Sequence, residues 1–220
     1  MQKSLILPNP SDFPALQSKV ICFASLGHFF GFKDFVEGSK VKSFGPSKNF
    51  TYSGGGLQIS VIGGLIGAGL TMLALENAIA AGGTDFTFFG TAGFIGQGDW
   101  EAGKLVSPQK SWDETGIAGK VGIATLDAFE PISGVEACSG MVSVPHFYAM
   151  TPEKLALYRG LGADLVDMEV ALANLFLRSK GFGLKALIQI TDGFDGEIWL
   201  DKRAETFQQA DLEKAFSILK

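Results

Sequence analysis

The chain has 220 residues, of which 46% are hydrophobic and 19% are charged, and its formal net charge is −5. This length and composition predict one well-buried domain over residues 1–220. The longest basic cluster is the short run at 201–203, so nucleic-acid binding has no electrostatic support.

Cysteine and histidine are scarce. Cys22 and Cys138 lie far apart and match no metal-ligand spacing, and His28 and His146 are the only two histidines. We therefore expect no metal, no cofactor and a reducing, cytoplasmic setting. The N-terminal residues do not have the pattern of a signal peptide.

Short apolar runs alternate with longer periodic segments along the chain. Because they are short, apolar and closed by small or polar residues, strands are expected at 19–25, 57–63, 85–93 and 184–190. Helical spacing and end signals predict helices at 70–83, 151–162, 163–181 and 204–219. Shorter extended pieces are expected at 104–108, 120–125 and 140–145.

The uncharged segment 53–75 has the length of a membrane-spanning helix. Its many glycines would each weaken such a helix by roughly 1 kcal/mol. A strand, a glycine turn and a helix explain the segment better, and we expect no membrane span. The turn does not have the spacing of a dinucleotide or P-loop motif. It is expected either to present backbone N–H groups to a ligand or to let a helix pack closely on a strand.

This alternation predicts an α/β protein whose sheet is covered by helices on both faces. In open α/β sheets, ligands bind beyond the carboxyl ends of the strands. Small or polar residues follow three of the expected strands, at Gly63-Gly64, at 90–93 and at Thr191-Asp192. We expect these distant segments to form one site.

Three carboxylates occur in segments that otherwise have the composition of a core. Asp167 and Glu169 lie in the expected helix at 163–181, and Asp192 follows the expected strand at 184–190. Burying an unpaired carboxylate costs several kcal/mol, so these positions call for an explanation. Glu169 and Asp167 suit a helix N-terminus, which is the only role expected for Asp167, and Asp192 suits a turn or a cap. The alternative is that Glu169 and Asp192 belong to a site.

Five motifs occur in order between about residues 57 and 195: GTAG at 90–93, EAGKLV at 101–106, PHFYAM at 145–150, LVDMEV at 165–170 and QITD at 189–192. Together they resemble the nucleoside phosphorylase family, which includes purine nucleoside phosphorylases, uridine phosphorylases and methylthioadenosine nucleosidases. The resemblance implies a twisted mixed sheet flanked by helices, and cleavage of the N-ribosyl bond of a nucleoside. It also implies a homo-oligomer.

The resemblance assigns roles to individual residues. Glu169 matches the glutamate that accepts hydrogen bonds from the ribose hydroxyls, and Met168 matches the methionine that packs against the sugar. Asp192 matches the general acid that protonates a purine ring nitrogen, which favours a purine substrate. Phe147 matches an aromatic residue that stacks on the base, although an ordinary core role is the alternative. The remaining expected substrate-binding residues are Thr91, Ala92, Gly93 and Val166.

The chain departs from the family at the position of the nucleophile. Phosphorylases hold phosphate with an arginine before the GTAG turn, where this chain has Phe88, and the usual glycine-and-arginine loop is replaced by CFASLG at 22–27. The glutamate that activates water in the hydrolases is also missing from this loop. We expect hydrolysis slightly more than phosphorolysis, with phosphate kept as an alternative co-substrate. A relative that binds a nucleoside without cleaving it, and an unrelated α/β protein, are the further alternatives.

Overall fold

The structure is a computed structural model that describes residues 7–116, 124–195, 198–202, 212–213 and 216–217. Its α-helices are α1 (Leu26–Phe35), α2 (Ala68–Ala80), α3 (Pro152–Leu161) and α4 (Val170–Ser179). Its strands are β1 (Lys19–Phe23), β2 (Lys42–Phe44), β3 (Ser47–Gly54), β4 (Leu57–Gly63), β5 (Asp85–Phe94), β6 (Leu105–Pro108), β7 (Lys110–Asp113), β8 (Ala124–Ala128), β9 (Glu136–Cys138), β10 (Met141–Ser143), β11 (Leu165–Asp167), β12 (Leu184–Asp195) and β13 (Ile198–Asp201). Two 3₁₀ turns lie at Pro10–Asp12 and Phe147–Ala149.

The described strands form one mixed sheet. Its centre is parallel, in the order β4, β1, β5 and β12. Antiparallel strands extend it, with β2 and β3 beyond β4 and with β6 and β13 on β12. A second parallel group, β11, β10 and β7, joins β5 through β11, which runs antiparallel to it. The long strands β5 and β12 therefore hold the two halves together.

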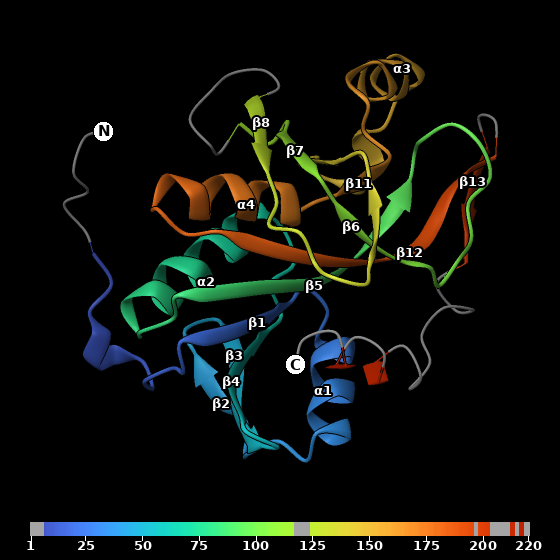
Figure 1. Cartoon of the computed structure of the whole chain (residues 1–220). Coiled ribbons are helices and arrows are strands. Elements are labelled where there is room, and N and C mark those ends of the chain that lie inside the picture. Colours follow the sequence, from blue (N-terminus) through green and yellow to red (C-terminus); the bar gives the residue numbers. More distant parts are fainter. Residues whose placement is uncertain (1–6, 117–123, 196–197, 203–211, 214–215, 218–220) are drawn as a thin grey trace.

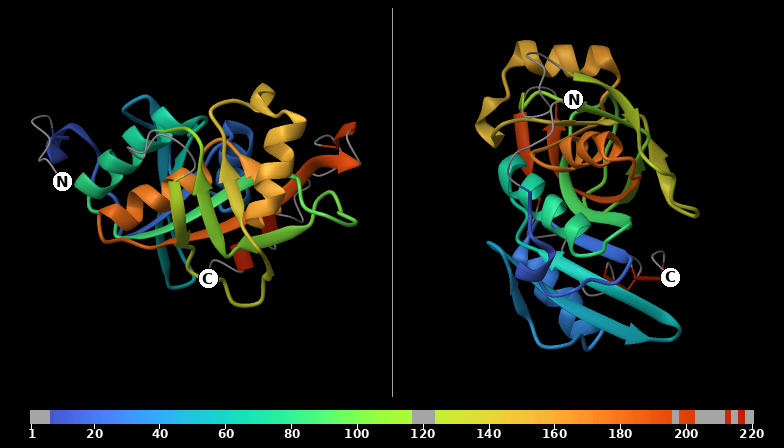
Figure 2. Two further views of the ribbon diagram at one scale, coloured as in Figure 1. Left: turned by 90° about the horizontal axis from the view of Figure 1, so that it is seen from above. Right: turned by 90° about the vertical axis from the view of Figure 1, so that its left-hand side faces the viewer.

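Helices cover both faces of the central strands (Figures 1 and 2). α2 and α4 contact each other on one face, where alternate residues of β1 and β5, such as Val20 and Phe88, join a core that includes Ala74 and Ala173. α1 covers the other face, with Phe29 and Phe32 packed among Ile21 and Phe89 of the same strands. Because successive side chains of a strand point to opposite faces, one apolar run serves both cores. The predicted α/β fold with a mixed twisted sheet is confirmed.

Most expected elements are present, with small shifts at their ends. The continuous helix expected at 163–181 is wrong, because Leu165–Asp167 forms strand β11 and α4 begins only at Val170. β11 is held on both sides, by β10 and by β5, and these long-range pairs override the local helical pattern. The strand expected at 184–190 runs on to Asp195, so Asp192 lies within a strand and neither opens a turn nor caps a helix.

Two expected elements lie partly outside the described residues. Of the extended piece at 120–125, only 124–125 are described, and they belong to β8. Of the C-terminal helix expected at 204–219, residues 212–213 and 216–217 are described and helical. The aromatic segment 27–35 forms α1, which buries Phe29 and Phe32 and leaves Phe30 exposed.

The glycine turn after β4 serves close packing. A Cβ on Gly63 would lie 2.4 Å from ring atoms of Phe29, so α1 can approach the strand only because this residue is glycine. This is the packing role expected for the turn.

We predict that Gly63→Ala lowers the free energy of unfolding by about 1–3 kcal/mol, because the added methyl group must push α1 away. Gly69→Ala is the matched control, since a Cβ on Gly69 in α2 meets nothing within 4 Å. The control should gain up to about 1 kcal/mol from the better helix propensity of alanine. Denaturant titration measures both, and equal effects of the two variants would contradict the packing argument.

Candidate active site

The site lies where the sheet divides. One edge of β5 pairs with β1 over Asp85–Phe89 and with β11 at Gly93–Phe94. Between them, Gly90–Ala92 has no partner strand on that edge within the described chain. The chain leaving β1 and the chain entering α4 diverge from this gap. A division of this kind is the topological switch point at which α/β sheets bind ligands.

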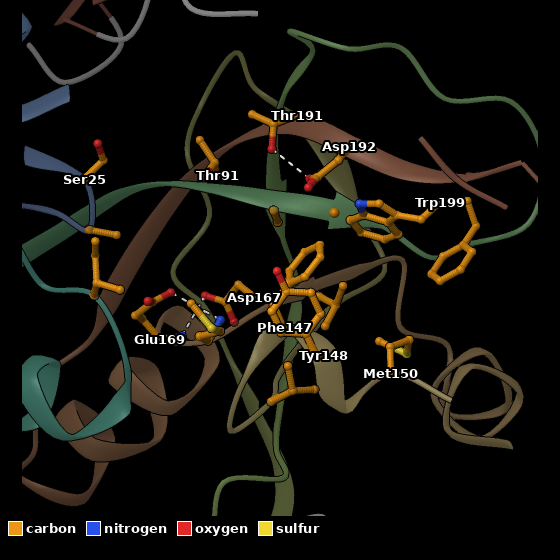
Figure 3. Close-up of a pocket in the computed structure, with 18 residues that line it drawn as sticks. Ser25, Thr91, Phe147, Tyr148, Met150, Asp167, Glu169, Thr191, Asp192 and Trp199 are labelled. Atoms are coloured by element: carbon orange, nitrogen blue, oxygen red, sulfur yellow. Dashed lines mark hydrogen bonds between the residues drawn. The ribbon is translucent and has the colours of Figure 1, made fainter. Parts of the chain in front are cut away.

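A cavity of about 590 Å³ fills this division. Its volume lies within the usual range for small-molecule sites. All eight residues expected to bind or transform a substrate line it (Figure 3): Thr91, Ala92, Gly93, Phe147, Val166, Met168, Glu169 and Asp192. The fold therefore brings these distant segments together around one cavity.

Glu169 is held at the cavity wall by backbone N–H groups. Its side chain is buried at 6% exposure, and Oε1 accepts a 2.6 Å hydrogen bond from Gly67 N, while Oε2 accepts one from Met168 N. Gly67 has a φ of +84°, a conformation that favours glycine and aims its N–H at the carboxylate. One of the two expectations for the glycine turn was that it presents backbone N–H groups to a ligand. Gly67 does present its N–H to an anion, but this anion is the Glu169 side chain of the same protein.

The hydrogen bonds of Asp167 compensate for the burial of its carboxylate. It accepts hydrogen bonds from the backbone N–H of Glu169 and of Val170, and from the hydroxyl of Ser143. Ser143 Oγ in turn accepts from Ala171 N and Leu172 N at 3.0 and 3.3 Å. The two side chains therefore satisfy the first N–H groups of α4, which frees Glu169 to face the cavity. The helix-terminus role expected for Asp167 is the one it has.

Burial raises the pKa of both carboxyl groups. For Asp167, burial is opposed by the hydrogen bonds from Ser143 and from the start of α4. For Glu169, burial and the charge of Asp167 together raise the pKa to about 8, against the opposing effect of the Gly67 and Met168 N–H groups. Glu169 is thus poised to change its charge near neutral pH, where a ligand that donates hydrogen bonds would favour the ionised form.

A β-bulge aims Asp192 into the cavity. Ile190 pairs with Ala92 and Asp192 with Gly93, so Thr191 is one residue too many on β12. In a regular strand Asp192, two residues after Ile190, would share the face of Ile190, which packs in the core with Ala92. Asp192 is 4% exposed, and one carboxylate oxygen accepts a 2.8 Å hydrogen bond from Thr191 Oγ1.

Aromatic rings form the side of the cavity. Trp199 packs edge-on against Phe194 and Phe147, with ring centres 4.8 and 5.0 Å apart. The sequence left open an ordinary core role for Phe147. This side chain is 39% exposed, so it is not part of the core. Gly93 lies under the indole, since a Cβ there would be 2.3 Å from the ring. The last glycine of the GTAG motif is therefore required by the approach of Trp199.

Several lining residues were not expected from the sequence, among them Ser25, Ile66, Met150, Phe194 and Trp199. Trp199 carried no signal of its own, because its place depends on the pairing of β13 with β12. Among the described lining residues there is no lysine, arginine or histidine. The described part of the chain contains no group of three metal-ligand side chains and no helix with the length and apolarity of a membrane span.

The chain belongs to the phosphorylase superfamily, whose sequence model matches residues 19–220. No curated protein matches it. Among solved structures, the purine nucleoside phosphorylase of Toxoplasma gondii in complex with immucillin-H is 19% identical, with a TM-score of 0.76 over 100% of this chain and 95% of that one. The 5′-methylthioadenosine/S-adenosyl homocysteine nucleosidase of Campylobacter jejuni is 15% identical, with a TM-score of 0.76 over 92% and 97%. A uridine phosphorylase from Vibrio fischeri is 15% identical, with a TM-score of 0.69 over 96% and 88%. These likenesses confirm the fold.

We predict that Ser143→Ala costs about 1–3 kcal/mol of unfolding free energy, because Asp167 loses a donor and two N–H groups of α4 lose their acceptor. Ser107→Ala is the control. Ser107 is also buried, but its hydroxyl has no hydrogen-bond partner among the described residues, so its loss should be neutral or stabilising. Denaturant titration compares the two, and an equal cost would show that the network contributes nothing.

A second prediction concerns pH. Because folding raises the pKa of Glu169 from 4.5 to about 8, the folded chain holds a proton that the unfolded chain has released over this interval. The free energy of unfolding should therefore fall as pH rises from about 4.5 to about 8, by up to about 1.4 kcal/mol per pH unit. Glu169→Gln should flatten this dependence. A variant that keeps the slope of the wild type would refute the assignment.

Proposed function

We propose that this protein cleaves the N-ribosyl bond of a purine-type nucleoside, with water as the nucleophile. One observation carries the proposal: Glu169 and Asp192, two buried carboxyl groups, face one cavity from separate walls, and aromatic rings line the cavity on the Asp192 side. Cleaving such a bond places positive charge on the sugar and negative charge on the base, as in glycoside hydrolysis. It needs a carboxylate at the sugar and an acid at the base.

Glu169 is assigned to the sugar. Its carboxylate is held by backbone N–H groups, so its position is fixed before a substrate binds. Ribose hydroxyls would donate to it and thereby favour its charged form. Such bonds tighten as the sugar becomes positive, and they stabilise the transition state most strongly where the surroundings are of low dielectric constant. Met168 and Val166, on the same segment, supply apolar contacts to the ribose.

Asp192 is assigned to the base. Its side chain is buried, and the bulge at Thr191 sets its direction. As the C1′–N bond breaks, its electron pair goes to the base, and the Asp192 proton goes to a ring nitrogen. Phe147 is assigned to stack on the base with the flat face of its ring. A purine has a ring nitrogen in a suitable position, and this supports the purine preference.

The charge of the cavity lining favours water over phosphate as the nucleophile. Phosphate would bring two negative charges into a cavity whose described lining residues include no cationic side chain. Water needs no such partner. The carboxylate that would activate water is also missing, because Ser25 lies near the position where it is expected. This second observation favours the alternative of a nucleoside-binding relative without turnover.

A homo-oligomer stays a prediction. Leu26, Phe30 and Ile66 are exposed apolar side chains near the Ser25 side of the cavity, and this supports it.

The decisive assay incubates purified protein with inosine, adenosine, methylthioadenosine or uridine, with and without phosphate, and separates the products by chromatography. Free base and free pentose without phosphate are expected from a purine nucleoside. Glu169→Gln and Asp192→Asn should each reduce kcat by about 10²-fold or more, since a general acid alone contributes about 10²–10⁴. Glu153→Gln, on the exposed start of α3, is the control and should keep full activity.

Other products would change the proposal. A pentose 1-phosphate formed only with phosphate would make the protein a phosphorylase with an unusual anion site. A nucleoside-dependent rise in melting temperature without base release would leave the binding protein as the better description. Release of uracil but of no purine would overturn the purine assignment.

A further inference from the structure

Trp199 lies across strand β12 beside Asp192. β13 pairs antiparallel with β12, with Trp199 opposite Phe194 and Asp201 opposite Asp192. Side chains two residues apart on a strand share a face, so Trp199 and Asp192 are diagonal neighbours on one face. The far edge of the indole reaches Gly93, the residue of β5 that pairs with Asp192 on the other side of β12. The ring therefore passes directly alongside the carboxyl group.

The indole N–H is the unexplained feature of this arrangement. This N–H is shielded from solvent, and it makes no hydrogen bond with a described residue. Figure 3 shows the nitrogen on the side of the ring that faces Asp192. Buried donors in native proteins are nearly always paired, so an exception at a site calls for a functional reason. Trp199 is also the only described lining residue whose side chain carries an N–H.

We propose that Trp199 is a positioning residue whose indole N–H donates a hydrogen bond to the Asp192 carboxylate as that group loses its proton to the departing base. This inference rests on the proposed function. The proton of Asp192 forms the new N–H bond of the base, the oxygen of water bonds to C1′, and a proton of that water returns to Asp192. Between these two transfers Asp192 is a buried anion, to which Thr191 Oγ1 donates and Trp199 would add a further donor.

A donor fixed in place before charge develops stabilises the charged state without the cost of reorganisation. The packing of Trp199 on Phe194, Phe147 and Gly93 supplies this rigidity. Because the indole carries an N–H that a phenylalanine ring lacks, a tryptophan at this place has a use that packing alone would not require.

The test is a double-mutant cycle. Trp199→Phe keeps a ring over Gly93 and removes the N–H. It should lower kcat for base release by about 10- to 100-fold, with KM little changed, because the hydrogen bond forms only as charge develops. In an Asp192→Asn background the same change should have almost no effect. In a Glu169→Gln background, Trp199→Phe should lower kcat by the same factor as it does in the wild type. Equal losses in all three backgrounds would show that Trp199 acts only through packing.

A second readout does not depend on turnover. The chain has three tryptophans, so ¹⁵N-labelled protein gives three indole N–H resonances, which Trp100→Phe and Trp112→Phe help to assign. Over a pH titration that converts Asp192 from its acid to its carboxylate, the Trp199 resonance should move as its N–H gains an acceptor, while the Trp112 resonance stays fixed, and Asp192→Asn should abolish this movement. An unmoved Trp199 resonance would overturn the inference. If the wild type releases no base, the proposed function fails, and the resonance alone decides whether Trp199 serves Asp192.

Discussion

The division of the sheet at Gly90–Ala92 is the constraint on which the rest of the site depends. β5 cannot pair with β1 and β11 at the same residues, so the two strands part and leave a gap that apolar packing does not fill. Every wall of the cavity is a consequence of that gap. The chain after β1, the start of α4 and the end of β12 all meet there because their strands end or bend around it.

Within this gap, Asp167 stabilises the fold by hydrogen bonds, and Glu169 remains available to contact a ligand. Asp167 and Ser143 together satisfy the N-terminus of α4, a task that Glu169 would otherwise take as the residue just before the helix. The backbone N–H of Gly67 then holds Glu169 at the wall. Fully satisfied networks of this kind fix a buried polar group in one geometry, which is what a group meant to meet a sugar requires.

On the β12 side of the cavity, the β-bulge at Thr191 and the indole ring of Trp199 orient the Asp192 side chain. The extra residue Thr191 turns Asp192 away from the core and provides a hydroxyl for it. Trp199 closes the aromatic side and lies beside the same carboxyl group. The cavity is thus acidic at two walls, aromatic along another and without a cationic side chain among its described lining residues, a combination that suits a neutral nucleoside and water better than a dianion.

The alternation of strands and helices and the strand ends at which a site forms can be predicted from the sequence, because hydrophobic period and small residues at strand ends are local features. The eight expected lining residues came from these strand ends and from the resemblance of short motifs to the family. That Leu165–Asp167 is a strand, that Thr191 forms a bulge and that Trp199 closes the site became visible only in the folded chain. Each of these depends on pairing between distant segments, as Gly67 and Glu169 illustrate at 102 positions apart. Local propensity differs by less than about 1 kcal/mol per residue, so such pairing overrides it without leaving a sign in the neighbouring sequence.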